Sequence, residues 1–226
     1  MGYDKGKLSR EQIIEAGAGV VLAKGYAATT IADLSHAAHT SAGKLTHHFP
    51  TKGSLFEAIF GSLMEGMEAG PLATLADAAL SPKKRIHGFL DGLYRLYAKQ
   101  PNPIGCPLGH AASDSGGVSA VMKEKALQTL QRINSLLDEV FRELGEAPEM
   151  ARVKANLFVS AWQGAIVVAR AGEGLEHIGR VFRYLKEIAP LSPAKSGNVG
   201  PSATRRGALA IRRMALQRRG LRNSEV

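Results

Sequence analysis

Apolar and small residues near the start of the chain recur with the period of a helix. They occupy positions 13, 14, 17, 20 and 21, which lie on one face of a 3.6-residue repeat. Ser9 and Gln12 have the spacing of a capping box, and Gly25 is well suited to end a helix because glycine readily adopts positive φ. We therefore predict a helix from about residue 10 to about residue 24.

Further helix starts follow closely. Thr30 and Asp33 form a second capping box, and Ser41 can cap a third helix in which Leu45 and Phe49 face inward. Proline cannot continue the backbone ladder, so this third helix should end before residue 50, and Thr51 can cap a fourth helix just after it. The pattern thus predicts one long helix, two short ones and another long one.

Beyond residue 70 the amphipathic pattern indicates longer helices. We expect them at about residues 81–100, 119–144, 149–171 and 175–188, with a short helix near residues 108–114. No segment has the alternation of a convincing strand. The sequence therefore predicts an all-α protein of about nine helices.

Composition narrows the class of protein. Hydrophobic residues make up 45% of the chain and aromatic residues only 6%, which is typical of a soluble helical protein. No apolar run approaches the ~20 residues that span a bilayer, and the polar start does not resemble a secretory signal. Cys106 is the single cysteine, so an internal disulfide is excluded. We expect a cytoplasmic protein with no membrane partner.

The net charge of +9 is concentrated at one end of the sequence. Residues 192–226 carry eight of the 29 Lys and Arg residues and one acid, Glu225. The basic balance is therefore weak evidence for a nucleic-acid partner of the folded body. The small polar residues at the start of this segment predict a disordered basic tail, with a marginal helix on a polyanion as the alternative for "ALAIRRMALQRR".

Two short helices joined by a tight turn and braced by a longer one form a helix-turn-helix pattern, whose second helix enters the DNA major groove. Residues 9–60 closely resemble the DNA-binding domain of TetR-family transcriptional repressors, through "GYAATTIADLSHAA", the S-x-G-x-L-x-HHF helix and the "TK" that follows. The resemblance implies a DNA-binding domain over 1–54, a ligand-binding and dimerisation domain over 55–191 and a tail over 192–226. It also implies a homodimer that represses from a palindromic operator and is released by a small inducer.

The resemblance assigns the DNA-binding residues position by position. Thr30 matches a residue that hydrogen-bonds a phosphate, residues 41–44 match those nearest base edges, and His48 and Lys52 match further phosphate contacts. The full expected set is Thr30, Thr40, Ser41, Ala42, Gly43, Lys44, Thr46, His47, His48 and Lys52.

Three positions depart from the family pattern. Thr46 stands where tyrosine is usual, His39 where glycine is common in the turn, and Gly53 where glutamate is frequent. The adjacent His47 and His48 lie about 100° apart on a helix, so they cannot chelate one ion as an i, i+4 pair does. We expect no metal and no cofactor, and few base-edge contacts in each half-site.

The second half of the chain is expected to hold a ligand pocket. Its adaptable methionines and aromatic residues suit an apolar cavity, and the few charges there favour a largely apolar inducer. For any single one of these residues, ordinary core packing is the alternative. The candidate lining residues are Phe60, Met64, Met67, Phe89, Leu93, Tyr97, Cys106, His110, Met122, Phe158, Trp162 and Gln163.

Cys106 suggests a second way of sensing. "IGCPLGHAASDSGG" and "WQGAIVVARAG" resemble segments of the NemR-type branch of the family, whose cysteine can respond to oxidants or electrophiles. His110 is four residues from Cys106 and could promote its thiolate if the segment is helical. The alternatives are a small buried apolar cysteine, or a Cys–His enzyme, for which no third orienting residue is visible. We expect no enzyme; a regulator that needs no ligand also stays open.

Small residues also suggest a dimer interface. They allow close helix approach, and with three larger apolar residues they suit a two-fold four-helix contact. The alternative is packing within one subunit. The candidate interface residues are Ala155, Ala161, Ala165, Val181, Phe182 and Leu185.

Overall fold

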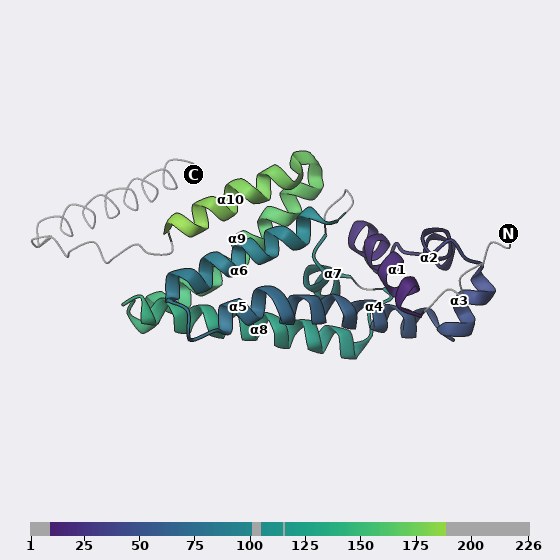
Figure 1. Cartoon of the computed structure of the whole chain (residues 1–226), viewed down its shortest axis with the longest axis horizontal. Coiled ribbons are helices and arrows are strands. Elements are labelled where there is room, and N and C mark those ends of the chain that lie inside the picture. Colours follow the sequence, from purple (N-terminus) through teal and green to yellow (C-terminus); the bar gives the residue numbers. More distant parts are fainter. Residues whose placement is uncertain (1–9, 101–104, 115, 189–226) are drawn as a thin grey trace, which may run out of the picture. The chain divides into compact units, whose positions relative to one another are not determined.

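The computed structural model describes residues 10–100, 105–114 and 116–188, whose regular elements are all helices (Figure 1). The first three are α1 (Arg10–Lys24), α2 (Ile31–Ala37) and α3 (Ala42–His48). The bounds expected for the first helix are confirmed; Ser9, its expected cap, lies outside the described residues. Gly25 ends α1 at φ +80°, and its N–H donates to the Val21 carbonyl at 2.7 Å.

The expected caps of the next helices are confirmed. The Thr30 hydroxyl accepts from the Asp33 N–H in a complete capping box at the start of α2. The Ser41 side chain accepts from the Lys44 N–H at the start of α3, and Thr51 caps α4 (Lys52–Met67). These side chains occupy backbone donors that have no partner within their own helix, and they fix where each helix begins.

The helical path continues past the end of α4. Gly70 and Pro71 do not end the helical path: a π-helical segment, η1 (Glu68–Leu72), carries it into the short α5 (Ala73–Ala76). Pro71 is buried, and a side chain at Gly92 would meet the Pro71 Cα at 3.1 Å. The wide π turn tolerates the proline because it relaxes the regular i to i−4 ladder that proline interrupts.

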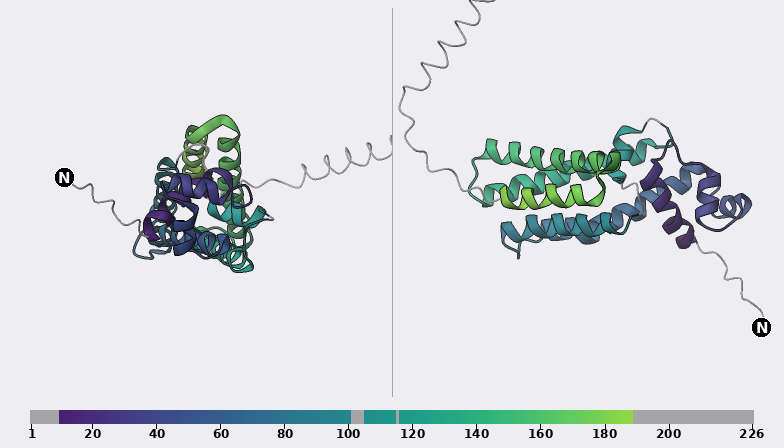
Figure 2. Two further views of the ribbon diagram at one scale, coloured as in Figure 1. Left: turned by 90° about the vertical axis from the view of Figure 1, so that its right-hand side faces the viewer. Right: turned by 90° about the horizontal axis from the view of Figure 1, so that it is seen from above.

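The remaining helices pack into a bundle. They are α6 (Pro82–Ala98), α7 (Pro107–Ser113), α8 (Ala120–Glu143), α9 (Pro148–Val168) and α10 (Gly174–Ile188), with a π-helical segment η2 (Ala169–Glu173) before α10. Helix α8 packs on α9, α9 on α10, and α6 on both α8 and α10. Figure 2 shows the long helices lying alongside one another. The expected all-α class is confirmed for the described residues.

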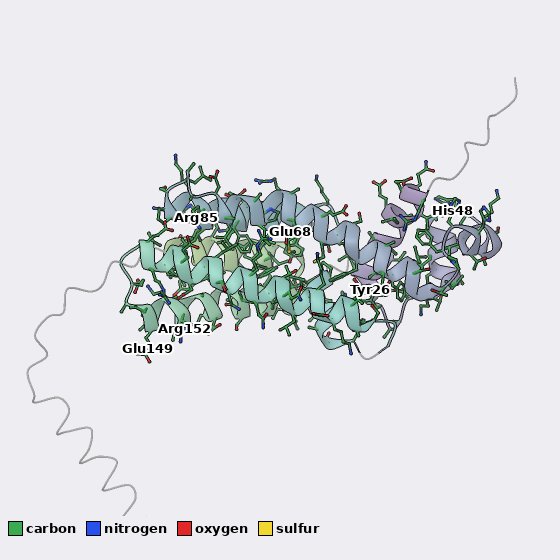
Figure 3. The ribbon with its side chains drawn as sticks, turned by 90° about the horizontal axis from the view of Figure 1, so that it is seen from below. Tyr26, His48, Glu68, Arg85, Glu149 and Arg152 are labelled. Atoms are coloured by element: carbon green, nitrogen blue, oxygen red, sulfur yellow. The ribbon has the colours of Figure 1, made fainter. Side chains whose placement is uncertain are left out.

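The core of the bundle contains packed aromatic residues and a buried arginine. Trp162 meets Phe89 edge to face at 5.9 Å, and its N–H donates to the Tyr97 hydroxyl at 2.7 Å. Arg85, near the start of α6, is only 1% exposed; its Nε donates to the Leu75 carbonyl at 2.7 Å and its guanidinium pairs with Glu143 at 2.8 Å. Figure 3 shows Arg85 far from His48 of α3. Hydrophobic periodicity did not predict the burial of this arginine.

Within the described part of the chain, no helix is both long and apolar enough to cross a membrane. The expectation of a disordered basic tail over residues 192–226 falls outside the described residues.

Candidate DNA-binding surface and ligand pocket

Helix α3 exposes one face and buries the other. Leu45 and Phe49, at 0% and 2% exposure, anchor it in the core as the sequence predicts. Ser41, Ala42, Gly43, Lys44, Thr46 and His47 are exposed, and Thr40 and His48 are half-buried. The two anchors are four residues apart and share one side of the helix. The remaining positions are therefore presented outward together, as a helix that enters a groove requires.

The hydroxyl groups of α3 are engaged within the helix itself. Ser41 Oγ accepts from the Lys44 N–H at 3.3 Å. Thr46 Oγ1 donates back to the carbonyls of Ala42 and Gly43 at 3.1 and 3.0 Å. Since one hydroxyl has one proton, Thr46 has none left for a phosphate in this rotamer. The exposed cation on this face is Lys44.

The turn before α3 accommodates the unusual His39. Its φ is +48°, in the left-handed region that glycine adopts at little cost and histidine less readily. The turn is held by the Thr40 N–H, which donates to the Ser35 carbonyl at 2.9 Å, and by the His39 N–H, which donates to the His36 carbonyl at 3.1 Å. This turn sets the direction in which α3 leaves α2.

At the start of α2, Thr30 is exposed but already hydrogen-bonded. Its hydroxyl donates to Asp33 Oδ2 at 2.8 Å, and Lys24 pairs with the other oxygen of Asp33 at 2.6 Å. These contacts lower the pKa of Asp33 to about 2. The hydrogen bond from Lys24 has the largest effect, and the hydrogen bonds from Thr30 come next. A phosphate contact from Thr30 therefore requires its hydroxyl to turn away from Asp33.

Two cations lie on aromatic rings beside α3. Lys52 Nζ is 5.0 Å from the centre of the Phe56 ring, and the Arg10 guanidinium is 4.8 Å from that of Phe49. Ring contacts of this kind hold a long side chain in place without neutralising its charge. Lys52 is also the first residue of α4, where the helix dipole favours an anion. Both features suit a phosphate contact.

The two histidines at the end of α3 touch each other. Their ring centres are 5.6 Å apart at an angle of 74°. Among the described residues, no group of three or more His, Cys, Asp or Glu side chains is arranged to hold a metal ion. His47 is exposed and His48 is half-buried at this end of α3.

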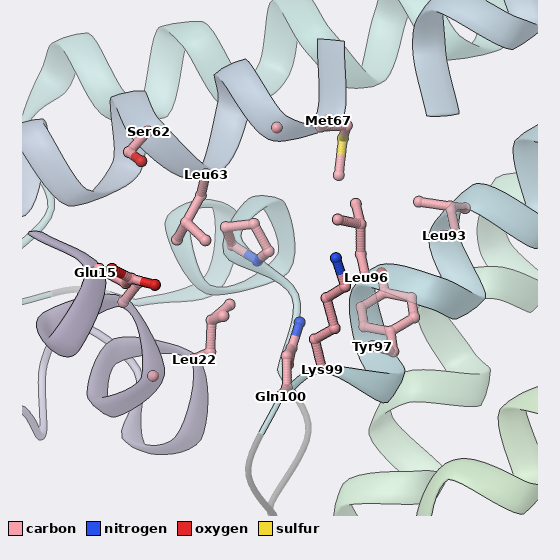
Figure 4. A pocket seen from close by; sticks show the side chains of 14 residues that line it. Glu15, Leu22, Ser62, Leu63, Met67, Leu93, Leu96, Tyr97, Lys99 and Gln100 are labelled. Atoms are coloured by element: carbon pink, nitrogen blue, oxygen red, sulfur yellow. The ribbon is translucent and has the colours of Figure 1, made fainter. Parts of the chain in front are cut away.

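A largely apolar pocket of about 360 Å³ lies between α1, α4 and α6. Figure 4 shows Leu22 of α1, Met67 of α4 and Tyr97 of α6 around it, and the charged Glu15 and Lys99 also line it. A pocket of this size is at the lower end of the range for small-molecule sites. Its lining residues are Glu15, Ala18, Gly19, Leu22, Ser62, Leu63, Gly66, Met67, Leu93, Leu96, Tyr97, Lys99, Gln100 and Pro107.

Only part of the expected lining belongs to this pocket. Met67, Leu93 and Tyr97 line it. Seven other candidates are buried in the core and do not line it: Phe60, Met64, Phe89, Cys106, Met122, Phe158 and Trp162. His110 and Gln163 are half-buried and also lie outside the lining.

The sequence did not predict that α1 lines the pocket. Glu15, Ala18, Gly19 and Leu22 all come from the helix that braces the recognition pair, whereas the ligand half was expected to begin after it. The available signal was the run of small residues "AGAG" at 16–19, since a helix without bulky side chains leaves room beside it. Hydrophobic periodicity does not report such a space.

Cys106 is a buried residue at the start of α7. It is 4% exposed, and the Gln163 amide donates to its sulfur at 3.5 Å. The side-chain hydrogen bond of His110 runs to the Leu22 carbonyl, at 3.1 Å, rather than to the thiol. The observed geometry therefore gives the expected Cys106–His110 pairing no support, for either sensing or catalysis.

Helices α9 and α10 bury the expected dimer residues and expose others. Ala155, Ala165, Phe182 and Leu185 lie in the core of the subunit, so these side chains are not available to a second copy, while Ala161 and Val181 are half-buried. One face of α9 instead exposes large apolar side chains, and Tyr184 of α10 is exposed as well. We call this set the apolar stripe: Met150, Val153, Leu157, Val167, Val168 and Tyr184.

Both halves of the chain match known regulatory proteins. Residues 13–59 match the family model described as bacterial regulatory proteins, tetR family. Residues 82–183 match the C-terminal domain of LmrA/YxaF-like transcriptional regulators. The HTH-type transcriptional repressor DhaR of Mycobacterium sp. strain GP1 is 22% identical over 163 residues, which cover 70% of this chain and 80% of DhaR.

Solved structures show the same fold. A TetR regulator from Legionella pneumophila aligns with a TM-score of 0.68 and 21% identity over 81% of this chain and 98% of that one. Reduced NemR from E. coli aligns with a TM-score of 0.58 and 17% identity over 79% and 95%. Both halves of the chain therefore match domains of transcriptional regulators, and α2 and α3 lie within the half that matches the N-terminal domain. The chain belongs to the TetR family of bacterial DNA-binding transcriptional regulators.

Proposed function

We propose that this protein is a homodimeric repressor that binds a palindromic operator and releases it when a small, largely apolar molecule fills the pocket between α1, α4 and α6. The observation that carries the proposal is the position of the pocket, which is lined by α1 as well as by α4 and α6. Helix α1 packs on α2, and α2 on α3. A bound molecule would therefore touch the framework of the recognition helix directly.

The DNA half of the proposal rests on the exposed face of α3. In this proposal Ser41, Gly43 and Lys44 approach base edges, while Lys52 and His48 approach phosphates. Ala42 and Gly43 have no side-chain donors, so shape and backbone contacts would supply a large share of the specificity.

The ligand half rests on the chemistry of the pocket walls. Leucines, Met67 and Pro107 give an apolar surface, and Ser62, Gln100, Glu15 and Lys99 supply a few polar groups. Such a site suits a molecule with an apolar body and one or two polar groups. To change DNA affinity, the molecule must bind the released arrangement more tightly than the DNA-bound one.

The dimer rests on the apolar stripe. Exposed patches of large apolar side chains mark protein interfaces, and α9 and α10 pack together so that their outer faces can meet a symmetry-related pair. The resulting two-fold would present two copies of α3 to the same side of the DNA.

Footprinting of the DNA upstream of the gene tests the operator. We expect protection of a palindrome whose half-sites are separated by about 34–36 Å or a multiple of it. Protection of one unpaired half-site, or none, contradicts the proposed dimeric repressor.

A thermal-shift screen of small apolar molecules tests the inducer. A stabilising compound should lower operator affinity, and Gly66→Trp, which adds bulk at the pocket wall, should abolish its binding. Gly61→Trp is the matched control, since Gly61 also has open space around it but does not line this pocket. A compound that binds Gly66→Trp as tightly as the wild type would place the site elsewhere.

A further inference from the structure

The C-terminal end of α1 is held by residues from the second half of the chain. The last carbonyls of a helix have no partner in their own helix and must find one elsewhere. The carbonyl of Leu22 would ordinarily accept from the Tyr26 N–H, but that N–H donates instead to Asp114 Oδ2, at 2.7 Å. The Leu22 carbonyl is therefore left open to outside donors.

Two side chains fill this place. His110 Nε2 is 3.1 Å from the Leu22 carbonyl oxygen, and a guanidinium nitrogen of Arg170 is 3.2 Å from it. His110 belongs to α7 and Arg170 to η2, so segments far apart in the sequence converge on one oxygen of α1. Because a carbonyl only accepts, Nε2 of His110 must carry the proton.

The backbone around this point fits closely. A side chain at Gly105 would lie 1.9 Å from the Leu22 carbonyl oxygen, so only glycine allows this approach. Gly25, at φ +80°, leaves room for Asp114, whose Oδ2 would be 2.8 Å from a Cβ there. Asp114 also accepts from the Ala27 N–H at 3.4 Å. The junction after α1 is thus shaped around its partners from the second half.

The same residue lines the pocket. The Leu22 side chain is part of the pocket wall, while its carbonyl is held by His110 and Arg170. A molecule that presses on this side chain therefore acts on the residue whose backbone ties α1 to α7 and η2. Since α1 packs on α2 and α4, and α2 packs on α3, a shift of its end would be passed to α2 and α3.

We propose that His110, Asp114 and Arg170 are positioning residues that latch the end of α1 in the DNA-binding arrangement, and that a molecule in the pocket lowers DNA affinity by displacing Leu22 from them. This inference rests on the proposed ligand-controlled DNA binding. It adds the contact through which the two sites are coupled.

A double-mutant cycle tests the latch without a known inducer. Gly66→Trp acts as a built-in substitute for a bound molecule, and His110→Ala removes one donor to Leu22. Each should weaken binding to the footprinted DNA about 10-fold, a typical coupling between two sites. If both act through the latch, the double variant should bind no more weakly than the weaker single variant. If the double variant instead loses DNA affinity by the product of the two single losses, the two changes act independently and the inference is overturned.

Two matched variants separate positioning from folding. Gln at position 110 keeps an N–H near the place of Nε2, so His110→Gln should restore most of the affinity that His110→Ala loses. Arg170→Ala should weaken DNA binding as His110→Ala does, whereas Arg95→Ala, which removes an exposed arginine from α6, should not. Loss in His110→Gln equal to that in His110→Ala would contradict the latch.

Hydrogen exchange gives a readout that needs no DNA. In the proposed latch, His110→Ala and Gly66→Trp both raise exchange of the backbone amides of residues 22–41, and His110→Gln leaves it near the wild-type level. If both variants raise exchange but the wild type binds no DNA, the proposed function is contradicted, while the contact between the pocket and the end of α1 is still supported. Unchanged exchange in both variants would overturn the latch.

Discussion

In the proposed complex, the side chain at position 46 influences how α3 contacts the DNA backbone. The Thr46 hydroxyl is turned back onto the carbonyls of Ala42 and Gly43, so it offers no donor to a phosphate. The usual tyrosine of the family would reach further from the same exposed position. We therefore expect the proposed DNA contacts of this helix to depend more heavily on Lys44 and His48.

Thr46→Tyr should strengthen operator binding. The phenol adds a donor at an exposed position, and one added phosphate contact of about 1 kcal/mol corresponds to roughly a 5-fold gain in affinity. Fluorescence anisotropy with operator DNA measures it, with Thr46→Phe as the control that lacks the hydroxyl. Equal affinities for the two variants would show that position 46 does not donate to the DNA.

Two buried tyrosines should respond in opposite directions to loss of their hydroxyl groups. Tyr26 packs edge to face on Phe56, and its buried hydroxyl has no hydrogen-bond partner among the described residues. The Tyr97 hydroxyl instead accepts from Trp162. Tyr26→Phe should raise the free energy of unfolding by about 1 kcal/mol, and Tyr97→Phe should lower it by a similar amount. Urea denaturation checks both; destabilisation by Tyr26→Phe would reveal a missing partner.

Features of the helices that depend on neighbouring residues could be predicted from the sequence, whereas features that depend on contacts between helices could not. The caps Thr30, Ser41 and Thr51 were recognisable because a cap acts within three residues of itself. The continuation of the helix through Pro71 was not recognisable, since it depends on a π turn and on Gly92 of another helix. Burial of Arg85 likewise depends on Leu75 and Glu143, which periodicity does not connect to it.

The candidate sites divide in the same way. The exposed positions of α3 follow from its own period once Leu45 and Phe49 are buried. The pocket wall on α1 and the hydrogen bonds to Leu22 come from elements that meet only in the fold. The core alanines of α9 were grouped with a dimer face because small residues suit packing within and between subunits equally well.

The contact between α7 and α1 should make stability depend on pH. Burial, as the first cause, lowers the pKa of His110; Arg170 lowers it further, while the Leu22 hydrogen bond and Asp114 oppose the shift. The unfolded chain binds a proton near the ordinary pKa of about 6.5, whereas the folded protein resists it. The His110 contribution to stability is therefore present above that pH and lost as the pH falls below it.

Urea denaturation at pH 7.5 and pH 5.5 measures this dependence. The free energy of unfolding should fall between the two pH values in the wild type and fall less in His110→Gln, which cannot titrate. An equal fall in both proteins would show that His110 does not contribute to it.

For the whole molecule, the apolar stripe should hold the dimer together. Leu157, at 61% exposure, lies within it, and Leu157→Glu would bury a charge in an apolar contact. We expect the dimer dissociation constant to rise at least about 10-fold, measured by analytical ultracentrifugation. Leu127→Glu, at a similarly exposed leucine of α8, is the control. An unchanged dimer in Leu157→Glu would place the interface on another face.

The central claim, that α3 binds operator DNA, is tested most directly by anisotropy titrations of the footprinted DNA with wild type, Lys44→Ala and Lys123→Ala over a range of salt concentrations. Lys123 is an exposed lysine of α8 and serves as the matched control. We predict that Lys44→Ala weakens binding about 10-fold and that affinity falls steeply with salt, while Lys123→Ala binds as the wild type does. Equal binding by Lys44→Ala and the wild type would contradict the assignment of α3 as the recognition helix.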